Sequence, residues 1–481
     1  MLFITTLNSN SNRLPPSGNS ATGAADSTRL LSGENQVIWT IWLTYGAFYF
    51  CRTNLAVALP GIQDELGYDK VQMGTVLLSL KIAYGFGQFV NGQLAERLSP
   101  RVMLAAGMIG SAALNIAFGF GTALYFFLFV WAVNGYCQSL GWTPCVRVLS
   151  NWVPVGRRGR AMGIVGTGYQ LTAGLTFIIS GVAVSWLGWR GAVWVPPAIL
   201  LASAAIMMLF LRESPSQSDS TSAGPRAGPT SSDRRSFAEN LKITLSNPAL
   251  WLLALSLAML NACRYGFLDW GVSHLYSVEK TRVQAAVAAG IESSSAVSMD
   301  GAVLKSAIKY AILPIGGIFG SLWAGWASDR FFGSRRAPVI CGLLVVLGCL
   351  TLVYDSVAQV SFVGTMLLLL AIGFTIYGPQ VLLVGTAPAD LATHGTSAAA
   401  AGFVNCMGYV GAALLGDLLT AHLAKYYGWR VAIFAWAAWA FLAAILVALL
   451  WHKTGGRSHN ASLKGVSSSD DLEPVSAPIP G

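Results

Sequence analysis

Long apolar stretches alternate with short polar segments along most of the chain, and this alternation predicts membrane-spanning helices. Each stretch is long enough to cross a ~30 Å hydrocarbon core, which takes about 20 residues of α-helix. Internal Pro144, Pro314 and Pro379 fit this interpretation because membrane helices tolerate proline. Twelve spans are predicted, near residues 37–59, 71–93, 102–120, 123–147, 161–186, 191–211, 249–277, 303–328, 337–355, 358–386, 395–423 and 431–451.

Polar segments divide these spans into two groups of six. A Ser-, Pro- and Arg-rich linker is predicted at 212–247, between an N-terminal half at 36–211 and a C-terminal half at 248–452. The polar ends, 1–35 and 453–481, have the composition of disordered tails. We therefore expect an all-α membrane protein with two pseudo-symmetric six-helix halves.

Composition and charge narrow the function. Of the 481 residues, 54% are hydrophobic and 11% are charged, against roughly 25% charged residues in soluble domains. This shortage argues against a soluble enzyme. The net charge of +9 first suggests an anionic partner. However, 19 of the 30 basic residues fall on one predicted side of the membrane, 8 on the other and 3 inside spans.

This asymmetry predicts that both termini are cytoplasmic. A plasma or inner membrane is expected, with an organellar membrane as the alternative. Because no basic patch lies on a soluble domain, we expect the lipid bilayer as a partner and no nucleic acid. The seven cysteines form no CxxC pair and no zinc spacing, so no metal or cofactor is expected. We expect a monomer.

The two halves repeat each other's motifs. A Gly-x-x-x-acid-Arg motif follows both the second and the eighth span, and Gly-Trp-Arg opens both the sixth and the twelfth. Repeated halves are typical of transporters whose substrate site lies at the midplane between them. We expect charged residues of the first motif to hold cytoplasmic helix ends together through ion pairs that break on switching: Glu96, Arg97, Arg101, Asp329 and Arg330.

Three basic residues lie inside predicted spans: Arg52, Lys81 and Arg264. An arginine at a helix centre costs roughly 2.5–3.5 kcal/mol and keeps its charge, so its position needs a reason. The alternative is that each arginine pairs with an acid or caps backbone carbonyl groups inside the bundle. Matching positions of Arg52 and Arg264 in the two halves favour a substrate role instead. Two guanidinium forks with nearby phenols suit a tetrahedral dianion such as phosphate.

Lys81 is predicted to be a third cation or a specificity residue, with a local ion pair or snorkelling as the alternative. Asp269 and Asp417 are the acids expected inside the membrane. A gate or an interfacial ion pair is favoured for them over a proton site. Asp269 is a poor partner for Arg264, because five residues of helix turn it away.

Several motifs resemble those of the organophosphate:phosphate antiporters of the major facilitator superfamily. They are Tyr49–Asn54, Ala83–Phe86, Leu140–Cys145, Arg264–Trp270 and Ile376–Pro379, and the resemblance covers about residues 37–451. The resemblance implies that Arg52 and Arg264 bind the phosphoryl group. It also implies that tyrosines line the path: Tyr45, Tyr49, Tyr84, Tyr265, Tyr377 and Tyr409.

The chain departs from glycerol-phosphate carriers at three positions. Thr53 stands where they have Lys, Gln88 corresponds to their span-two Lys, and Tyr169 corresponds to their span-five His. Gln88 and Tyr169 are therefore candidate substrate residues, and recognition of the organic moiety is open.

The expected function is exchange of an organic phosphate ester for inorganic phosphate by alternating access. One alternative is a membrane-bound phosphate-ester sensor, and another is a proton-coupled transporter of a different organic anion. No Ser/His/Asp set or carboxylate dyad supports an intramembrane enzyme.

Overall fold

A computed structural model describes residues 33–95, 98–215, 242–288, 299–332, 335–391 and 397–451. Within these ranges the regular structure is helical and contains no strand, so the predicted all-α fold is confirmed. Helices that continue one another along one path form twelve successive segments in the described part of the chain.

The first half contains six of these segments. Its elements are α2 (Glu34–Ala47), η2 (Phe48–Cys51) and α3 (Leu55–Leu66), then α4 (Lys70–Leu94), α5 (Pro100–Phe118), α6 (Leu124–Ser139) with α7 (Trp142–Trp152), α8 (Val155–Leu187), and η3 (Gly188–Arg190), α9 (Gly191–Trp194) and α10 (Pro196–Phe210).

The second half contains the other six. Its elements are α12 (Pro248–Ala288), α13 (Met299–Tyr310) with α14 (Ile312–Phe331), α15 (Arg336–Val360), α16 (Phe362–Val381) with η6 (Leu382–Thr386) and α17 (Ala387–Leu391), α18 (Ser397–Gly411) with η7 (Ala412–Leu419) and α19 (Thr420–Tyr426), and α20 (Trp429–Ala448).

By length and composition, eight helices in the described ranges are apolar enough to cross a membrane. Several remaining paths are interrupted, and this explains why they miss that criterion. The first path breaks between η2 and α3 at Arg52, and the fourth breaks between α6 and α7 at Gly141. Breaks of this kind occur in membrane proteins where the backbone is buried in protein or lines a cavity.

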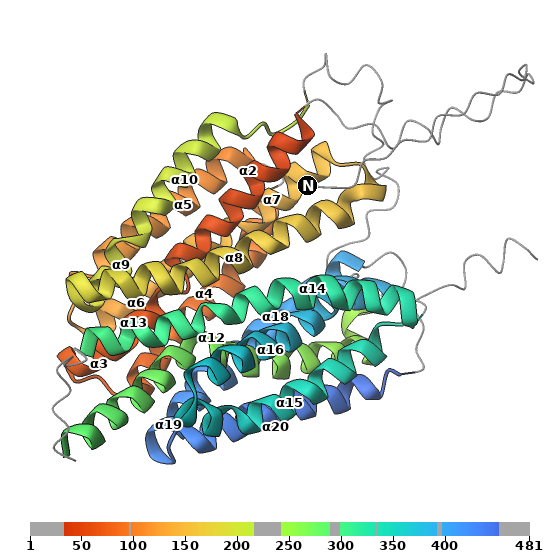
Figure 1. Ribbon diagram of the computed structural model, residues 1–481. Coiled ribbons are helices and arrows are strands. Elements are labelled where there is room, and N and C mark those ends of the chain that lie inside the picture. The colour runs from red at the N-terminus through yellow and green to blue at the C-terminus, as the bar shows by residue number, and fades with distance from the viewer. Residues whose placement is uncertain are drawn as a thin grey trace, which may run out of the picture.

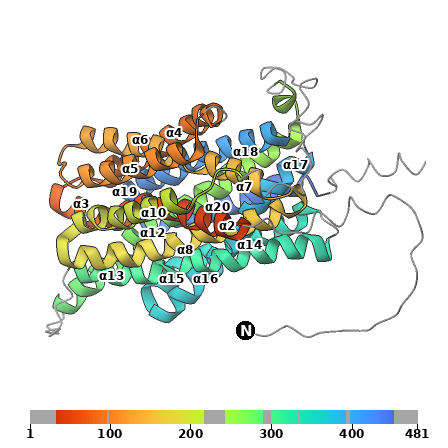
Figure 2. The same cartoon turned by 90° about the horizontal axis from the view of Figure 1, so that it is seen from above.

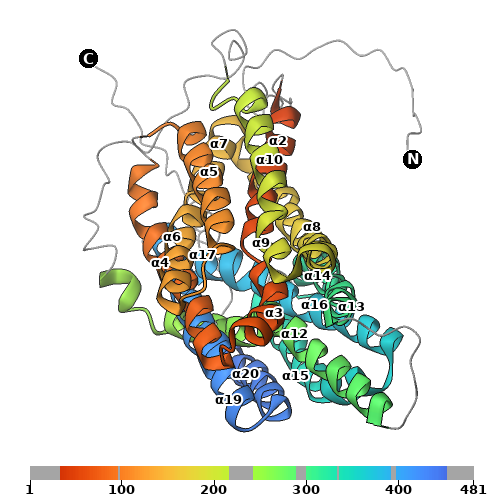
Figure 3. The same ribbon diagram turned by 90° about the vertical axis from the view of Figure 1, so that its left-hand side faces the viewer.

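The two halves lie side by side along a long seam. In Figure 1 the first half (red to yellow) lies above the second (green to blue), and Figure 2 shows the bundle from above. α8 packs against α13 and α14, as Figure 3 also shows. α3 packs against α12, and α4 packs against η7 and α19.

Glycines allow the closest approach on this seam. A Cβ atom at Gly174 would lie 2.8 Å from the Ala311 carbonyl oxygen, and one at Gly181 would lie 2.9 Å from the Ala307 Cβ. These distances are shorter than real Cβ contacts, so α8 comes this close to the second half only because these two positions are glycine.

Candidate functional site

Arg52 lies at the break in the first helical path and is 9% exposed. Its Nε donates a 3.0 Å hydrogen bond to Oε1 of Gln138 on α6. Its guanidinium carbon lies 4.7 Å from the ring centroid of Tyr49 and 4.5 Å from that of Tyr84. Nη2 is buried without a hydrogen-bond partner among the described residues. The cation therefore keeps donor capacity for a ligand.

Side-chain amides stabilise the break beside Arg52. The Nδ2 atoms of Asn115 and Asn134 donate to the Cys51 carbonyl at 3.2 and 3.1 Å, and Nε2 of Gln138 donates to the Phe48 carbonyl at 3.0 Å. All three amides are fully buried. They supply the donors that water cannot supply in hydrocarbon. Sequence analysis missed them, although amides inside apolar spans are the signal that would have found them.

Arg264 lies on a helix without any such break. α12 runs without interruption from Pro248 to Ala288, and Arg264 is 3% exposed on it. Its guanidinium carbon lies 4.7 Å from the ring centroid of Tyr265 and 5.0 Å from that of Tyr377. Its Nε is buried and has no partner within the described ranges. Both predicted arginines are thus buried on aromatic faces with unused donors.

A cavity between the halves brings the two arginines together. Within the described residues, neither guanidinium forms an ion pair with a carboxylate. Two buried cations without acidic partners make the cavity favourable for an anion, because an unpaired buried charge is costly. The charged and phenolic groups that line the cavity are Arg52, Arg264, Lys81, Asp269, Tyr49, Tyr84, Tyr265 and Tyr409.

The remaining predicted tyrosines join this lining through ring contacts. Tyr169 stacks on Tyr49 with centroids 5.0 Å apart and contacts Tyr45 at 6.0 Å and Tyr377 at 6.4 Å. Tyr409 contacts Tyr84 at 4.8 Å. The rings form two clusters, one of Tyr45, Tyr49, Tyr169 and Tyr377 and one of Tyr84, Tyr265 and Tyr409, and each cluster contains residues of both halves. Arg52 and Arg264 each contact one ring of either cluster.

Gln88 is the one predicted substrate residue outside this arrangement. It lies on α4 one turn beyond Tyr84, is partly exposed, and does not line the cavity. Its Nε2 is buried without a partner in the described part of the chain. A role for Gln88 in binding stays a prediction.

Lys81 lines the cavity but is already neutralised. Its Nζ lies 2.6 Å from Oδ2 of Asp269 and 2.5 Å from Oδ2 of Asp417, and also 4.5 Å from the ring centroid of Tyr265. Lys81 comes from the first half and both acids come from the second. Lys81 therefore forms ion pairs that join the two halves, with two acids on one cation. Whether Lys81 also binds substrate stays a prediction.

Three of the predicted gating residues, Arg101, Asp329 and Arg330, lie at the end of the bundle where α5 begins and α14 ends. Asp329 pairs with Arg336 of α15 at 2.6 Å, and Arg336 also pairs with Asp390 of α17 at 3.3 Å. The backbone N–H of Arg101 donates to Glu213 at 3.2 Å. Arg330 is exposed at the end of α14. Glu96 and Arg97 lie outside the described residues. These contacts join neighbouring helix ends, and their part in switching stays a prediction.

Ion pairs close the opposite end of the bundle, where α3 ends and α4 begins; we call this the α3–α4 end. Asp64 pairs with Lys280 of α12 at 3.0 Å and accepts a hydrogen bond from Tyr276. Asp69 pairs with Lys425 of α19 at 2.9 Å. Both pairs join the two halves. Beside them lies a cavity lined by these four charged residues, Tyr276 and Ser273 among others.

The pKa of Asp69 reflects this closure. Partial burial would raise the pKa, but hydrogen bonds from the backbone N–H of Gln72 and from Lys425 outweigh burial and hold the pKa of Asp69 below its usual value. Asp69 therefore stays ionised, and its pair with Lys425 stays intact, down to acidic pH.

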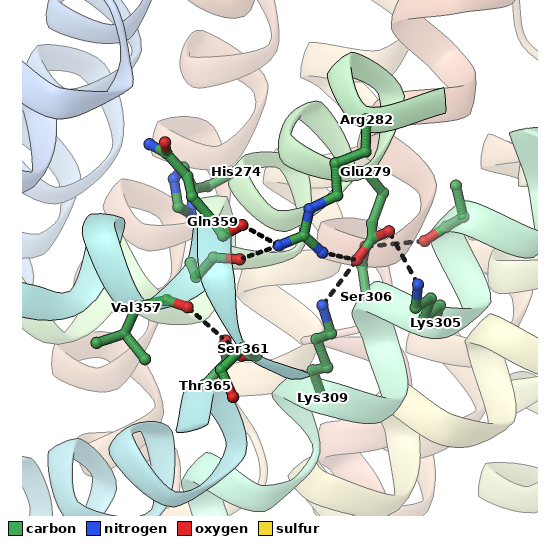
Figure 4. Close-up of polar contacts among 12 residues, drawn as sticks. His274, Glu279, Arg282, Lys305, Ser306, Lys309, Val357, Gln359, Ser361 and Thr365 are labelled. Atoms are coloured by element: carbon green, nitrogen blue, oxygen red, sulfur yellow. Dashed lines mark hydrogen bonds and ion pairs between the residues drawn. The ribbon is translucent and has the colours of Figure 1, made fainter. Parts of the chain in front are cut away.

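A buried acid at the same end organises three cations (Figure 4). Glu279 of α12 pairs with Lys309 at 2.8 Å, Lys305 at 3.0 Å and Arg282 at 3.3 Å. Arg282 also donates to the Ala358 carbonyl of α15 at 3.2 Å. Sequence analysis did not select Glu279. The cluster fastens α13 and α15 to the end of α12 within one half.

No group of three or more His, Cys, Asp or Glu side chains in the described ranges is arranged to hold a metal ion. The site's chemistry is instead that of anion binding by guanidinium, ammonium and phenol groups. The described residues that line the cavity offer groups that can bind and release an anion.

The sequence matches the family model of the Major Facilitator Superfamily over residues 41–416, with a second match over 310–469. The chain therefore belongs to the major facilitator superfamily and, by its relatives, to the organophosphate:phosphate antiporter family within it. It is a multi-pass membrane protein of a transporter family and not an enzyme.

Three relatives define this placement more narrowly. A probable hexose phosphate transport protein of Chlamydia trachomatis is 30% identical over 87% of this chain and 91% of its own length. The glycerol-3-phosphate transporter of Bacillus subtilis is 28% identical, covering 88% and 94%. The membrane sensor protein UhpC of Escherichia coli is also 28% identical, covering 80% and 84%.

Solved structures support the fold independently. A bacterial homologue of the human lysosomal transporter Spinster, in an inward-facing and unoccupied conformation, superposes with a TM-score of 0.68. The match covers 86% of this chain and 96% of that one at 16% identity, so it bears on the fold alone.

Proposed function

We propose that the protein exchanges an organic phosphate ester for inorganic phosphate by alternating access. The observation that carries this proposal is the pair Arg52 and Arg264, which come from opposite halves, line one cavity and have no acidic partner in the described residues. Two relatives whose names state phosphate-ester transport support the same substrate class.

The charge pattern explains why exchange is favoured over leak. With the cavity empty, closing the halves around two unpaired guanidinium groups is costly. A phosphate dianion neutralises both and is bound bidentately by the planar forks. The loaded protein therefore switches more readily than the empty one. A substrate must leave before another returns, which couples the two fluxes.

In this proposal the moving bodies are the halves 36–211 and 248–452, joined by the cytoplasmic linker 212–247. The proposed orientation places both termini in the cytoplasm and the α3–α4 end on the opposite side. The protein works as a monomer in the bilayer, with inorganic phosphate and a phosphate ester as its small-molecule partners.

Purified protein in liposomes preloaded with phosphate tests the proposal. Wild-type protein takes up labelled phosphate only when counter-phosphate is present inside. Arg52→Lys loses the bidentate contact, and its exchange rate falls roughly 10- to 150-fold, as expected for a charged hydrogen bond of about 1.5–3 kcal/mol. Arg190→Lys is the matched control, because Arg190 pairs with Glu65 away from the cavity. Unchanged exchange in Arg52→Lys contradicts the proposal.

The relative named as a membrane sensor favours a second candidate, a phosphate-ester sensor. The same cavity serves either function, since both need a phosphate-binding site. Saturable phosphate binding by the purified protein without exchange in liposomes supports the sensor and excludes the exchanger.

A further inference from the structure

Lys81 forms ion pairs with two buried acids, Asp269 and Asp417, and one carboxyl oxygen of Asp417 is left without a hydrogen-bond partner among the described residues. Asp417 is 0% exposed, and its Oδ1 has no hydrogen-bond partner among the described residues. Asp269 is 6% exposed and borders the cavity, whereas Asp417 does not line it. One ammonium group therefore faces two carboxyl groups, and if both are ionised the set carries a net negative charge inside the membrane.

The π-helical segment η7 places Asp417 in this position. It interrupts the regular helix between α18 and α19, and such segments are frequent at functional sites. Gly416 brings its backbone against α12, since a Cβ there would lie 3.1 Å from the Tyr265 Cβ. Gly74 of α4 brings that helix against η7 and α19, since a Cβ there would lie 3.2 Å from the Asp417 carbonyl oxygen and 2.7 Å from the Ala421 Cβ. Close packing on both sides keeps water from Asp417.

The groups around Asp417 come from every element packed against η7. α4 contributes Lys81, and α12 contributes Asp269 and Tyr265. Tyr409 of α18 packs towards Tyr265. On α19, Lys425 is turned to Asp69, and the ring of His422 packs on that of Tyr426. Among these groups, Lys81 is the single cation in contact with the two acids.

We propose that Asp269 and Asp417 share one proton beside Lys81, and that this proton sets the charge of the substrate site. Two buried carboxyl groups on one ammonium do not both ionise without a large cost, because like charges and burial each favour the neutral acid. The proton reaches Asp269 from the cavity and belongs to the pair of acids rather than to either one.

This inference rests on the proposed function and accounts for the net charge of the substrate site in each protonation state. With one proton bound, the set of Lys81, Asp269 and Asp417 is neutral, and Arg52 and Arg264 leave two positive charges for a dianion. When the proton is lost to solution, the set becomes negative and the site retains one net positive charge. Dianion binding therefore weakens as the pH rises through deprotonation of the pair.

Phosphate exchange at alkaline pH tests this in full-length protein in liposomes, with inorganic phosphate as the probe. Between pH of about 8.5 and 10 free phosphate is almost entirely dianionic, because this range lies well above its second ionisation, so its own ionisation contributes little. We expect the KM of the wild type to rise at least roughly fivefold, a typical size for coupling between two binding events. In Asp417→Asn, which imitates the protonated acid, KM stays flat.

Asp355→Asn is the matched control, because Asp355 pairs with His274 away from the cavity, and it should keep the wild-type pH profile. If Asp417→Asn exchanges phosphate with the wild-type pH profile, the shared proton is excluded while the exchanger stands. If the wild type exchanges no phosphate, the proposed function itself fails.

A second measurement does not depend on the folding of any variant. Infrared spectra of the wild type should show a protonated carboxyl band at neutral pH that disappears over the same alkaline range in which KM rises. A spectrum without such a band at neutral pH overturns the proposal.

Discussion

The two halves present the same cation in two different ways. Arg52 lies at a helix break, and three buried amides support the carbonyls beside it. Arg264 lies within the uninterrupted α12, which also carries Tyr276 and Lys280 of the α3–α4 end. In the second half, the substrate cation and the closing contacts thus share one rigid helix. In the first half, the break separates α2 from α3, which carries Asp64.

This difference indicates that the two halves have different parts in the response to a bound anion. A pull on Arg264 by a bound anion is transmitted along α12 as a rigid-body motion, because a helix is stiff along its axis. A pull on Arg52 acts on a junction where side-chain amides bond the Phe48 and Cys51 carbonyls. The second half is therefore suited to transmit the binding event, and the first half is suited to adapt to the ligand.

The largest expected effect separates the two arginines directly. Arg52→Lys and Arg264→Lys should each reduce phosphate exchange roughly 10- to 150-fold through loss of the bidentate contact. Only Arg52→Lys should also lower the melting temperature, because it loses the bond to Gln138 at the break. Thermal unfolding in detergent measures this difference. Equal melting temperatures for the two variants would remove the distinction between the halves.

The amide support of the break gives the next largest effect. Asn115→Leu removes one of the donors to the Cys51 carbonyl and removes the Oδ1 acceptor of Asn54 Nδ2, which keeps its bond to the Ala192 carbonyl. Losing two buried hydrogen bonds, each worth about 0.5–1.5 kcal/mol, should cost about 1–3 kcal/mol of unfolding free energy. Thr351→Ala in α15 is the control, since its hydroxyl donates to the Leu347 carbonyl of its own helix. Equal destabilisation in both variants would argue against a specially supported break.

A smaller effect is expected where α12 meets α3. Asp64→Asn weakens its exposed pair with Lys280, and exposed pairs contribute at most about 1 kcal/mol, or a factor of about five in an equilibrium. Ser273 lines the cavity at the α3–α4 end. A cysteine introduced there should react with a membrane-impermeant maleimide up to about fivefold faster in the Asp64→Asn variant than in the protein with native Asp64. High salt should produce a similar increase in the protein with native Asp64, because salt screens exposed charges. A labelling rate that ignores both changes would show that this pair does not hold the end closed.

The smallest expected effect is that of pH on the same closure. The pKa of Asp69 is held below its usual value, so its contribution to the closed state is fully present above the ordinary Asp range and is lost only as pH falls through the lowered pKa. Labelling of the Ser273→Cys protein should therefore be constant between pH of about 6 and 8 after correction for thiol reactivity. A steep change in that range would assign pH sensitivity to the α3–α4 end rather than to Asp269 and Asp417.

Sequence alone predicted the fold and much of the cavity for identifiable reasons. Apolar length defines spans, and Arg52 and Arg264 were conspicuous because charge is rare inside them. Asp417 could not be assigned to Lys81, because the two are 336 residues apart and only packing of η7 on α4 brings them together. The break at Arg52 was equally hidden, since Phe48–Cys51 reads as an ordinary apolar stretch and its support comes from amides on α5 and α6.

The glycines of α8 at the seam have a mechanical consequence. Gly174 and Gly181 put the α8 backbone almost directly on Ala311 and Ala307, and Phe177, which lies between them on α8, packs its ring on Tyr310 of α13. At the two glycines the helices can rotate against each other with few changes of side-chain rotamer. The seam of α8 with α13 and α14 is thus suited to be the axis about which the two halves rotate, with the largest displacements at the ends of the bundle.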